Sequence, residues 1–408
     1  KAAGFDDPIH RIDWAKVVSW KDHMIGGLVK NIGVLVKGNK VDTIFGAAHL
    51  SGTHTAVIEL ASGGTETVEF DQAVIATGSV PFPIPGFSID GTDILGSKEA
   101  LDLSSVPDSL IVIGGGVIGL EIGTIFAKLG TKVSVVEFTP SLLPVIEKDL
   151  VVPVTRTLSK LGVEVYLSSK ATAWKKKGKR LEMTVDTPEG AKAIVCDKIL
   201  LAVGRAPRTQ GLNLESAGVE LDKRGHIVVD TEMLSSASNI YAIGDVIGPP
   251  YLAHKASREA VLAAQSIAGK ALEVKGHVPW AVFTDPEISW VGMTESESKA
   301  AGIAVDIGKF PFAASGRAMA VRETEGFCKV VADKANHRIL GAGFVGPNAS
   351  DLIGEACLAV SVGATLEQVA QTIHPHPTLC EAFAEACESA LGHPVHMLRI
   401  KREAPVFS

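Results

Sequence analysis

A glycine-rich turn between an apolar strand and a helix constrains the fold of this chain more than any other feature. The turn covers residues 114–119, has the spacing G-x-G-x-x-G, and follows directly on an apolar run at 110–113. A segment of helical composition follows at 117–129, closed by a glycine, and a second predicted strand covers 131–137. Strand, glycine turn, helix and strand in this order predict a βαβ unit within a parallel sheet.

The same turn predicts a nucleotide site. Glycine permits the tight turn and the close approach of a pyrophosphate, and the helix start offers free N–H groups and a positive dipole end. Glu137 ends the second strand, 18 residues after Gly119, where its carboxylate can accept a hydrogen bond from a ribose 2′-hydroxyl and would repel a 2′-phosphate. We therefore expect NAD rather than NADP at this turn; a purely structural glycine turn is the alternative.

Composition argues against several other classes of protein. The 408 residues carry a net charge of −7, so no broad basic surface points to a nucleic-acid partner. Hydrophobic residues make up 46% and charged residues 21%, as in globular rather than disordered proteins. The longest uncharged apolar run, 110–120, is too short to span a membrane. The five scattered cysteines argue against a disulfide framework and fit a reducing compartment.

Asp245 is a candidate ligand for a sugar. It follows the predicted strand 239–243 (Asn-Ile-Tyr-Ala-Ile) and one glycine, so its carboxylate lies at the carboxyl end of that strand. At the edge of an open sheet such a carboxylate can hold a sugar or ribityl hydroxyl. A helix N-cap or a turn aspartate is the alternative interpretation.

His376 and Glu381 form a candidate acid/base pair. Pro377 and Thr378 predict a helix that begins just after His376, with Glu381 on it. Glu381 would turn back and orient the imidazole, raise its basicity and allow it to cycle a proton. A structural histidine is one alternative. A metal site shared with His374 is another, but no third ligand is in view, so we expect no metal.

The rest of the chain divides by pattern. Residues 10–37 have helical spacing of apolar side chains. Residues 71–81 echo 197–207, which suggests two related dinucleotide-type modules. From about residue 277 strands alternate with long Ala-rich helices, which predicts a separate α+β unit.

Seven short motifs follow one another in an order typical of one family. They are 76–79 (Ala-Thr-Gly-Ser), 114–119, 202–205 (Ala-Val-Gly-Arg), 242–246 with 252–256, 284–287 (Thr-Asp-Pro-Glu), 309–312 (Lys-Phe-Pro-Phe) and 376–378 with Glu381. The chain resembles the flavoprotein pyridine nucleotide-disulfide oxidoreductases and, within them, the dihydrolipoamide dehydrogenases, the E3 components of 2-oxo-acid dehydrogenase complexes. Glutathione reductases share His-Pro-Thr but usually continue with Ser-Ser-Glu-Glu instead of Leu-Cys-Glu-Ala-Phe, and mercuric reductases lack this histidine. A glutathione-reductase-like enzyme is therefore the alternative within the family.

The resemblance implies two cofactors, FAD and NAD. For FAD, Asp245 would hold the ribityl chain and Ala48 would touch the adenine end through its backbone. Further FAD contacts are implied at Thr77, Gly78 and Ser79, and along the pyrimidine edge of the flavin at Tyr251, Leu252, Ala253 and His254. The NAD site is implied at Gly114, Gly115, Gly116, Val117, Ile118, Gly119, Leu120, Glu121, Glu137, Ala171 and Gly204.

The resemblance also implies an α/β fold with Rossmann-like modules and a C-terminal α+β dimerisation domain. Residues 1–85 and 209–276 would form the FAD-binding and central domain, 86–208 the NAD-binding domain, and 277–408 the interface of a homodimer. Across that interface His376, oriented by Glu381, would serve the dithiol substrate as acid and base at the partner subunit's flavin.

The reaction implied is oxidation of dihydrolipoamide, carried on a lipoyl domain of a 2-oxo-acid dehydrogenase complex. Electrons would pass through a redox disulfide and FAD to NAD⁺ and so contribute to cell redox homeostasis. We expect this in the cytoplasm, or in the mitochondrial matrix of a eukaryote, without nucleic acid or membrane as partner.

Two parts that the resemblance implies are absent from the 408 residues: a first βαβ unit with its own G-x-G-x-x-G, and a Cys-x4-Cys redox pair. The five cysteines do not replace the pair: Cys380 and Cys387, seven apart on a helix, would be about 10 Å apart, beyond the limit of about 7 Å for a disulfide. We expect the sequence to be part of a full-length enzyme; a truncated product and a true short form are the alternatives. The competing function is a non-catalytic, NAD-binding dimer.

Overall fold

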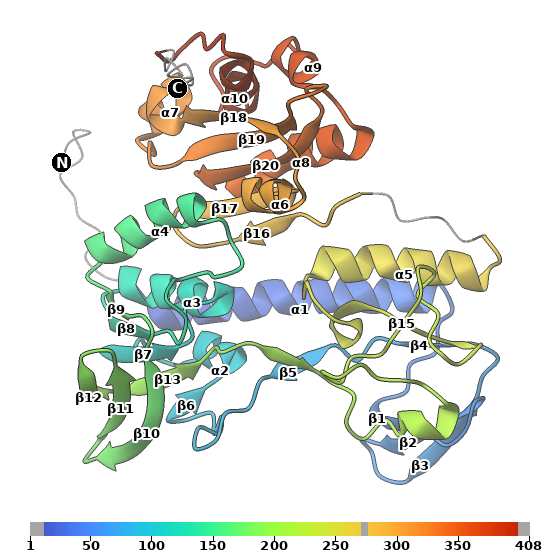
Figure 1. The fold of residues 1–408 in the computed structure, drawn as a ribbon. Coiled ribbons are helices and arrows are strands. Elements are labelled where there is room, and N and C mark those ends of the chain that lie inside the picture. Colours follow the sequence, from blue (N-terminus) through green and yellow to red (C-terminus); the bar gives the residue numbers. More distant parts are fainter. Residues whose placement is uncertain (1–11, 271–275, 399–408) are drawn as a thin grey trace.

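The computed structural model describes residues 12–270 and 276–398. Figure 1 shows two lobes side by side, joined by a pair of extended segments, and a third, C-terminal lobe that lies over the first. We call them the nucleotide lobe, the central lobe and the C-terminal lobe. Their element bounds follow.

The nucleotide lobe is built on a five-stranded parallel sheet. Its order is β6 (Ile94–Leu95), β13 (Lys198–Leu201), β7 (Ser109–Ile113), β8 (Lys132–Val136) and β9 (Glu164–Tyr166). Helix α3 (Val117–Lys128) connects β7 to β8, and α4 (Lys148–Lys160) connects β8 to β9. All five residues of β7 are buried, as the apolar run predicts for a central parallel strand. The predicted βαβ unit is confirmed.

An antiparallel unit and a short helix complete this lobe. The unit consists of β10 (Lys170–Lys177), β11 (Arg180–Thr187) and β12 (Gly190–Cys196), and the helix is α2 (Ser97–Leu101). The unit packs its apolar side chains under the sheet, where Leu181, Met183 and Val185 join Ile111 and Ile199 in one core cluster.

The central lobe combines two small sheets. An antiparallel sheet contains β1 (Gly46–Leu50), β2 (Thr55–Leu60) and β3 (Thr65–Glu69); β4 (Ala73–Ile75) pairs in parallel with β15 (Ile240–Ala242). Two short 3-10 helices, η1 (Leu214–Ala217) and η2 (Gly244–Ile247), and helix α5 (Ala253–Ile267) complete it.

The two echoing segments connect the central and nucleotide lobes. Each continues from a strand, β4 or β13, through a glycine with positive φ, Gly78 (73°) or Gly204 (122°). The strands that follow, β5 (Ser79–Pro81) and β14 (Arg205–Pro207), pair with each other antiparallel. The repeated sequence therefore places both connections side by side.

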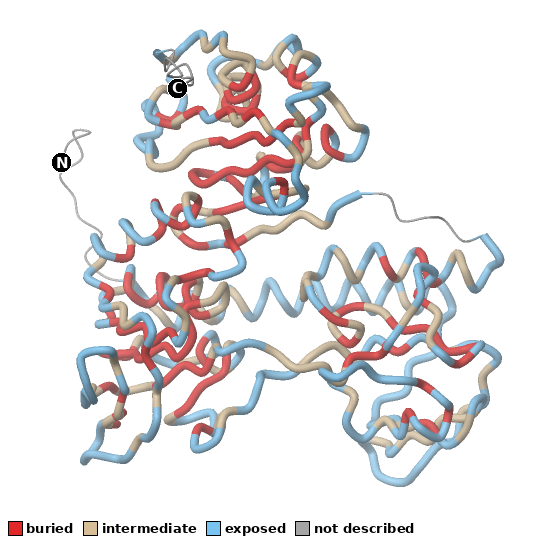
Figure 2. The backbone as a smooth tube through the Cα atoms, in the orientation of Figure 1, coloured by how far each residue is buried: buried red, intermediate tan, exposed pale blue. Residues whose placement is uncertain are grey.

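Helix α1 (Trp14–Gly38) confirms the helix predicted at 10–37, from residue 14 onward. It is attached at its start: Trp14 Nε1 donates to the Leu103 carbonyl at 2.7 Å, and Lys21 pairs with Asp102. Figure 2 shows the helix exposed or half-buried along its length, and none of its residues is buried. Trp20 is 67% exposed, because no described element covers that face of the helix.

The C-terminal lobe has a five-stranded antiparallel sheet with its longer helices on one face. Its order is β16 (Trp280–Val282), β17 (Glu287–Gly292), β20 (Ile339–Gly346), β19 (Phe327–Asp333) and β18 (Val305–Pro311). The helical elements are α6 (Glu295–Ala300), η3 (Phe312–Ala314), α7 (Gly316–Val321), α8 (Ala349–Val362), α9 (Leu366–Ala370) and α10 (Glu381–Leu391). The predicted α+β unit is confirmed.

A close approach and a shared core fix this lobe. A Cβ at Gly308 of β18 would lie 1.8 Å from the Ala386 carbonyl oxygen, so α10 rests directly on the strand. On the opposite side, Ile288 and Trp290 share one hydrophobic core cluster with Leu150 and Val154 of α4. Burial of apolar surface therefore continues from the nucleotide lobe into the C-terminal lobe.

In the described ranges, no helix is both long and apolar enough to cross a membrane.

Candidate functional site

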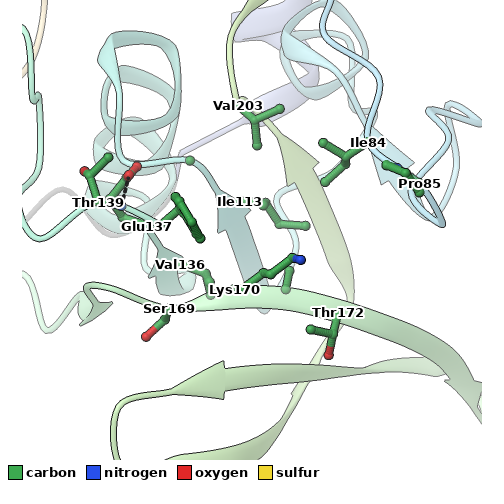
Figure 3. A pocket seen from close by; sticks show the side chains of 13 residues that line it. Ile84, Pro85, Ile113, Val136, Glu137, Thr139, Ser169, Lys170, Thr172 and Val203 are labelled. Carbon is green, nitrogen blue, oxygen red and sulfur yellow. Dashed lines mark hydrogen bonds between the residues drawn. The ribbon is translucent and has the colours of Figure 1, made fainter.

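A cavity of about 660 Å³ lies beside the glycine turn of the nucleotide lobe (Figure 3). It opens at the carboxyl ends of β7 and β8, the edge at which open parallel sheets bind their ligands. The residues that line it are Ile84, Pro85, Ile113, Gly114, Val136, Glu137, Phe138, Thr139, Ser169, Lys170, Ala171, Thr172 and Val203.

Two glycines of the turn are required by close contacts. A Cβ at Gly114, whose φ is 108°, would lie 2.4 Å from the Ala202 carbonyl oxygen, and one at Gly119 would lie 2.1 Å from the Gly114 oxygen. Gly116 differs, because a Cβ there would meet no atom within 4 Å. It precedes α3, and no side chain caps this helix start, so the first N–H groups face open space. An anionic group fits there.

Glu137 is 7% exposed and held by two backbone donors. Its Oε2 accepts the Gly115 N–H at 2.6 Å and its Oε1 accepts the Thr139 N–H at 2.7 Å. These bonds tie the carboxylate to the glycine turn, and each oxygen retains a lone pair for a further donor such as a ribose hydroxyl.

The structure separates the predicted NAD residues into three groups. Gly114, Glu137 and Ala171 line the cavity, whereas Gly204 adjoins it through Val203. The residues Gly115, Gly116, Val117, Ile118 and Gly119 form the turn and helix start beside it.

Leu120 and Glu121 point elsewhere. Leu120 is completely buried in the core, because the helical period turns it toward the sheet. Glu121 faces the C-terminal lobe, where it accepts the Phe283 N–H at 2.8 Å, and burial raises its pKa. The sequence reasoning missed Phe138 and Thr139, although both directly follow Glu137, and it missed Ser169, Lys170 and Thr172, the neighbours of the predicted Ala171.

A second cluster of polar side chains forms beside the paired strands β5 and β14, which connect the central and nucleotide lobes. Ser79 on β5 donates its hydroxyl to Asp245, and Arg205 on β14 donates from Nε to Ser79 Oγ at 2.6 Å and from Nη2 to the Ser79 carbonyl at 2.6 Å. Thr77 Oγ1 donates to the Arg208 carbonyl at 2.8 Å. Ser79 and Asp245, two of the implied FAD contacts, therefore lie side by side, and Arg205, which was not predicted, joins them. Gly78 lies in the turn between Thr77 and Ser79, and its φ is 73°.

Ala48 lies outside this cluster. It is exposed in β1, where it pairs with Ile58 of β2.

The segment 251–254 leads into helix α5 close to Asp245. Leu252 precedes the helix without a side-chain cap, so the N–H groups of its first turn, which begins at Ala253, are open to a ligand. His254 Nε2 contacts the Pro279 carbonyl at 2.7 Å, and the Tyr251 hydroxyl contacts a histidine ring. Glu259, buried on α5 and not predicted, accepts the Gly244 N–H at 2.8 Å and fixes the Asp245 turn to the helix.

The predicted contact between His376 and Glu381 is present in the C-terminal lobe. His376 Nδ1 lies 2.9 Å from Glu381 Oε1, and Glu381 Oε2 accepts the Thr378 N–H at 2.8 Å. Partial burial acts to raise the pKa of Glu381, but the Thr378 N–H and His376 lower it overall. The His376 side chain is 75% exposed, and with Nδ1 held by the carboxylate its Nε2 is the nitrogen open to a proton exchange.

The predicted start of the helix was wrong. Helix α10 begins at Glu381 and not just after His376, because the intervening residues form a loop with a cis His376–Pro377 bond. His374 has its own carboxylate, Glu355, at 2.8 Å. No group of three metal-ligating side chains occurs among the residues that the structure describes.

All five cysteines, Cys196, Cys328, Cys357, Cys380 and Cys387, are free thiols. Burial raises the pKa of Cys196 to about 12, and burial also raises the pKa of Cys328, Cys357 and Cys387. Such thiols are poor nucleophiles. Cys380, half-buried, contacts the Thr378 hydroxyl at 2.9 Å.

Curated proteins that resemble this chain over most of its length are named dihydrolipoyl dehydrogenases. The chain is 42% identical to a dihydrolipoyl dehydrogenase of Haloferax volcanii over 96% of its own length and 83% of the relative's. It is 43% identical to the corresponding protein of Thermus scotoductus (95% and 83% covered) and 40% identical to the mitochondrial one of Bos taurus (92% and 75%).

Solved structures show the same fold. The crystal structure of LpdA from Mycobacterium tuberculosis matches with a TM-score of 0.88 and 28% identity, over 95% of this chain and 84% of the other. The flavoprotein disulfide reductase RclA of Escherichia coli, induced by HOCl, matches with a TM-score of 0.85 and 26% identity, over 92% and 86%.

Two family models cover most of the chain. The model of the pyridine nucleotide-disulphide oxidoreductases matches residues 5–260, and the model of their dimerisation domain matches residues 278–387. The chain therefore belongs to the pyridine nucleotide-disulphide oxidoreductase family.

Proposed function

We propose that this protein is a dihydrolipoyl dehydrogenase, which oxidises dihydrolipoamide and passes the electrons through a redox disulfide and FAD to NAD⁺. The observation that carries the proposal is the exposed imidazole of His376 held by the Glu381 carboxylate at 2.9 Å. Relatives named dihydrolipoyl dehydrogenase, 40–43% identical over most of the chain, support it. A protein that only bound nucleotide would not need this pair.

The cavity beside the glycine turn fits NAD. The open space at Gly116 and the uncapped start of α3 suit the pyrophosphate, and the Glu137 carboxylate suits the ribose hydroxyls. In this position NAD⁺ would accept a hydride. The protein contributes orientation: Glu137 is fixed by two N–H donors before the ligand arrives.

The cluster around Ser79 and Asp245, together with the start of α5, fits the ribityl and pyrimidine parts of FAD. Asp245, held by Ser79, offers a carboxylate oxygen to a ribityl hydroxyl, and the α5 start offers N–H donors to the electron-rich edge of a flavin. FAD would supply the two-electron step between dithiol and nicotinamide. Thr77, Gly78 and Ala48 complete the proposed FAD contacts.

His376 would act on the proton of the dithiol substrate. With Nδ1 held by Glu381, the Nε2 lone pair can take a proton from a substrate thiol and give a thiolate, the nucleophile in thiol–disulfide exchange. The ionised Glu381 stabilises the imidazolium that results. No two of the five cysteines have the Cys-x4-Cys spacing of the redox pair, so these 408 residues do not supply the acceptor disulfide.

The remaining parts of the proposal concern assembly. Residues 278–387 match the family's dimerisation domain, and we propose a homodimer in which His376 serves the partner subunit's flavin. We further propose the division into a central unit (1–85 with 209–276), an NAD unit (86–208) and an interface unit (277–408). The substrate would be carried on a lipoyl domain of a 2-oxo-acid dehydrogenase complex, in the cytoplasm or the mitochondrial matrix.

Replacement of His376 by Ala in the full-length enzyme tests the assignment. Loss of a general acid/base lowers turnover by about 10²- to 10⁴-fold, so oxidation of dihydrolipoamide should fall by that factor. Transfer from NADH to an artificial dye bypasses the dithiol step and should stay near wild type. His396→Ala is the matched control, because His396 also contacts a carboxylate of α10, that of Glu385, at 2.5 Å. Equal loss of both activities in His376→Ala would overturn the assigned role.

Two measurements separate the alternatives. A non-catalytic nucleotide-binding dimer would lack the flavin absorbance at about 450 nm in the full-length protein. A glutathione-reductase-like enzyme would reduce oxidised glutathione faster than lipoamide.

A further inference from the structure

One arginine lies where the proposed flavin site meets the connection to the nucleotide lobe. Arg205 is the first residue of β14, and the proposed reaction gives it no role. In the β5–β14 pair Arg205 is opposite Pro81, two residues beyond Ser79. Arg205 and Ser79 are therefore diagonal neighbours on one face of the strand pair, a separation that a long side chain can bridge.

Two donors of Arg205 engage Ser79. Nε donates to Ser79 Oγ at 2.6 Å, and Nη2 donates to the Ser79 carbonyl at 2.6 Å. The guanidinium is a rigid plane with donors at fixed angles, so two bonds to one residue fix the position of both side chains. Arg205 Nε lies 4.0 Å from Asp245 Oδ2, which is beyond hydrogen-bond distance. The contact between the arginine and the aspartate therefore passes through Ser79.

The arginine decides the direction of the Ser79 hydroxyl. A serine hydroxyl has one proton to donate and two lone pairs that accept. Because an arginine does not lose its proton, its Nε–H always occupies one lone pair of Oγ, and the hydroxyl proton points away from the guanidinium. The Ser79 hydroxyl donates that proton to Asp245 Oδ2. This orientation leaves Asp245 Oδ1 as the acceptor for a ribityl hydroxyl.

We propose that Arg205 is a positioning residue of the flavin site, which holds the Asp245 carboxylate through Ser79 in the orientation that accepts a ribityl hydroxyl. The inference rests on the proposed function, because it requires FAD at Asp245. The side chains of Arg205 and Asp245 are 29% and 25% exposed, so water competes only partly with these hydrogen bonds.

The nucleotide lobe contains the same three residue types in the same hydrogen-bonded order, which provides a matched control. Arg180 Nη2 donates to Ser109 Oγ at 2.7 Å, and the Ser109 hydroxyl donates to Asp197 Oδ2 at 2.6 Å. Arg180 and Ser109 begin β11 and β7, away from the proposed flavin site. Arg180→Met therefore removes an equivalent arginine without touching a proposed FAD contact.

The FAD affinity of the apoprotein is the main measurement. Apoprotein of the full-length enzyme is titrated with FAD, followed by the quenching of flavin fluorescence. A hydrogen bond to a charged group contributes about tenfold or more, so Arg205→Met should bind FAD about tenfold more weakly than wild type. Arg180→Met should bind FAD as wild type does. Equal weakening in the two variants would overturn the proposal, because it would reflect a general loss of stability.

Two further variants separate positioning from charge and from direct contact with the cofactor. Arg205→Lys keeps the charge but cannot place two coplanar donors on Ser79, so it should bind FAD as weakly as Arg205→Met. Full recovery in Arg205→Lys would overturn the proposal in favour of charge alone. In a Ser79→Ala background Arg205→Met should cause little additional loss, because the residue through which it acts is already changed. An additional loss of about tenfold there would equally overturn it.

Binding of NADH to the same proteins provides a readout that does not involve flavin. Arg205 does not line the nucleotide cavity, so NADH affinity by calorimetric titration should be the same in wild type and Arg205→Met. A parallel loss of NADH affinity would overturn the proposal, because it would show that the substitution disrupts the whole β5–β14 connection. A full-length wild-type protein that binds no FAD would instead refute the proposed function, and this inference with it.

Discussion

A buried lysine between the nucleotide lobe and the C-terminal lobe leads to a quantitative stability prediction. Lys329 Nζ, on β19, lies 2.7 Å from Glu147 and 3.0 Å from Asp149 at the start of α4, and 2.9 Å from Glu295 on α6. Burial acts to lower the pKa of Lys329, but the three carboxylates raise it overall, so the ammonium stays charged. The charge thus links the lobe that carries His376 to the lobe that carries the nucleotide cavity.

Replacement of Lys329 by Met keeps most of the apolar stem and removes this charge. The Lys329 side chain is 2% exposed and that of Glu147 is 9% exposed, so the carboxylate left behind is poorly solvated. Removal of one partner of a buried ion pair costs about 3–5 kcal/mol. Asp149 and Glu295 are more exposed, at 30% and 49%, so water screens their interaction with Lys329. We therefore expect the substitution to cost about 3 kcal/mol, the lower end of that range.

Thermal unfolding at neutral pH measures the effect. For a unit of 150–250 residues each kcal/mol lowers Tm by about 2–4 °C, so Lys329→Met should melt about 6–12 °C below wild type. Lys309→Met is the matched control: Lys309 reaches Asp149 at 2.6 Å across the same gap but is 44% exposed. Exposed pairs contribute about 0–1 kcal/mol. Equal shifts for the two variants would refute the argument that burial sets the magnitude.

Three other predictions follow from the same contacts. Glu137→Ala removes a carboxylate that accepts two backbone N–H groups and is aimed at a ribose, so NADH affinity by calorimetric titration should fall about tenfold to hundredfold; an unchanged affinity would contradict the site. Gly119→Ala places a Cβ 2.1 Å from the Gly114 oxygen and should lower both Tm and NADH affinity, whereas Gly116→Ala meets no atom within 4 Å and should keep its Tm; equal melting would be inconsistent with the close approach. Burial acts to raise the pKa of Asp149, but Lys309 and Lys329 lower it overall. The ionised carboxylate therefore stabilises the fold fully above the ordinary aspartate range, and this stabilisation is lost as the pH falls through the depressed pKa. In acid unfolding, Lys309→Met should lose less stability than wild type on going from neutral to acid pH.

Local patterns predicted well wherever the backbone itself imposes the requirement. Gly114 needs a positive φ and Gly119 needs the absence of a Cβ, and both demands arise within a few residues of the turn. The buried strand before the turn is recognisable from its apolar run. The position of Glu137 then follows, because it ends the next parallel strand.

Two predictions failed although the features that decide them are local. Pro377 and Thr378 are typical of a helix start, yet α10 begins only at Glu381, whose carboxylate takes the Thr378 N–H and stabilises a loop instead. Leu120 belongs to a motif that binds nucleotide but is turned into the core by the helical period.

The sequence by itself determined the α/β class, the glycine turn with its acidic partner, and the pair of His376 with Glu381, since each depends on residues close in the chain or on one strand–helix–strand unit. Only the tertiary structure decided that Ser79, Arg205 and Asp245 meet, that His226 joins Asp222 to Tyr251, and that Lys329 is enclosed by three carboxylates. Most of these contacts join residues far apart in the chain. They exist because β5 pairs with β14 and because the C-terminal sheet packs on α4, and pairing of this kind depends on the geometry of whole lobes and on no local pattern.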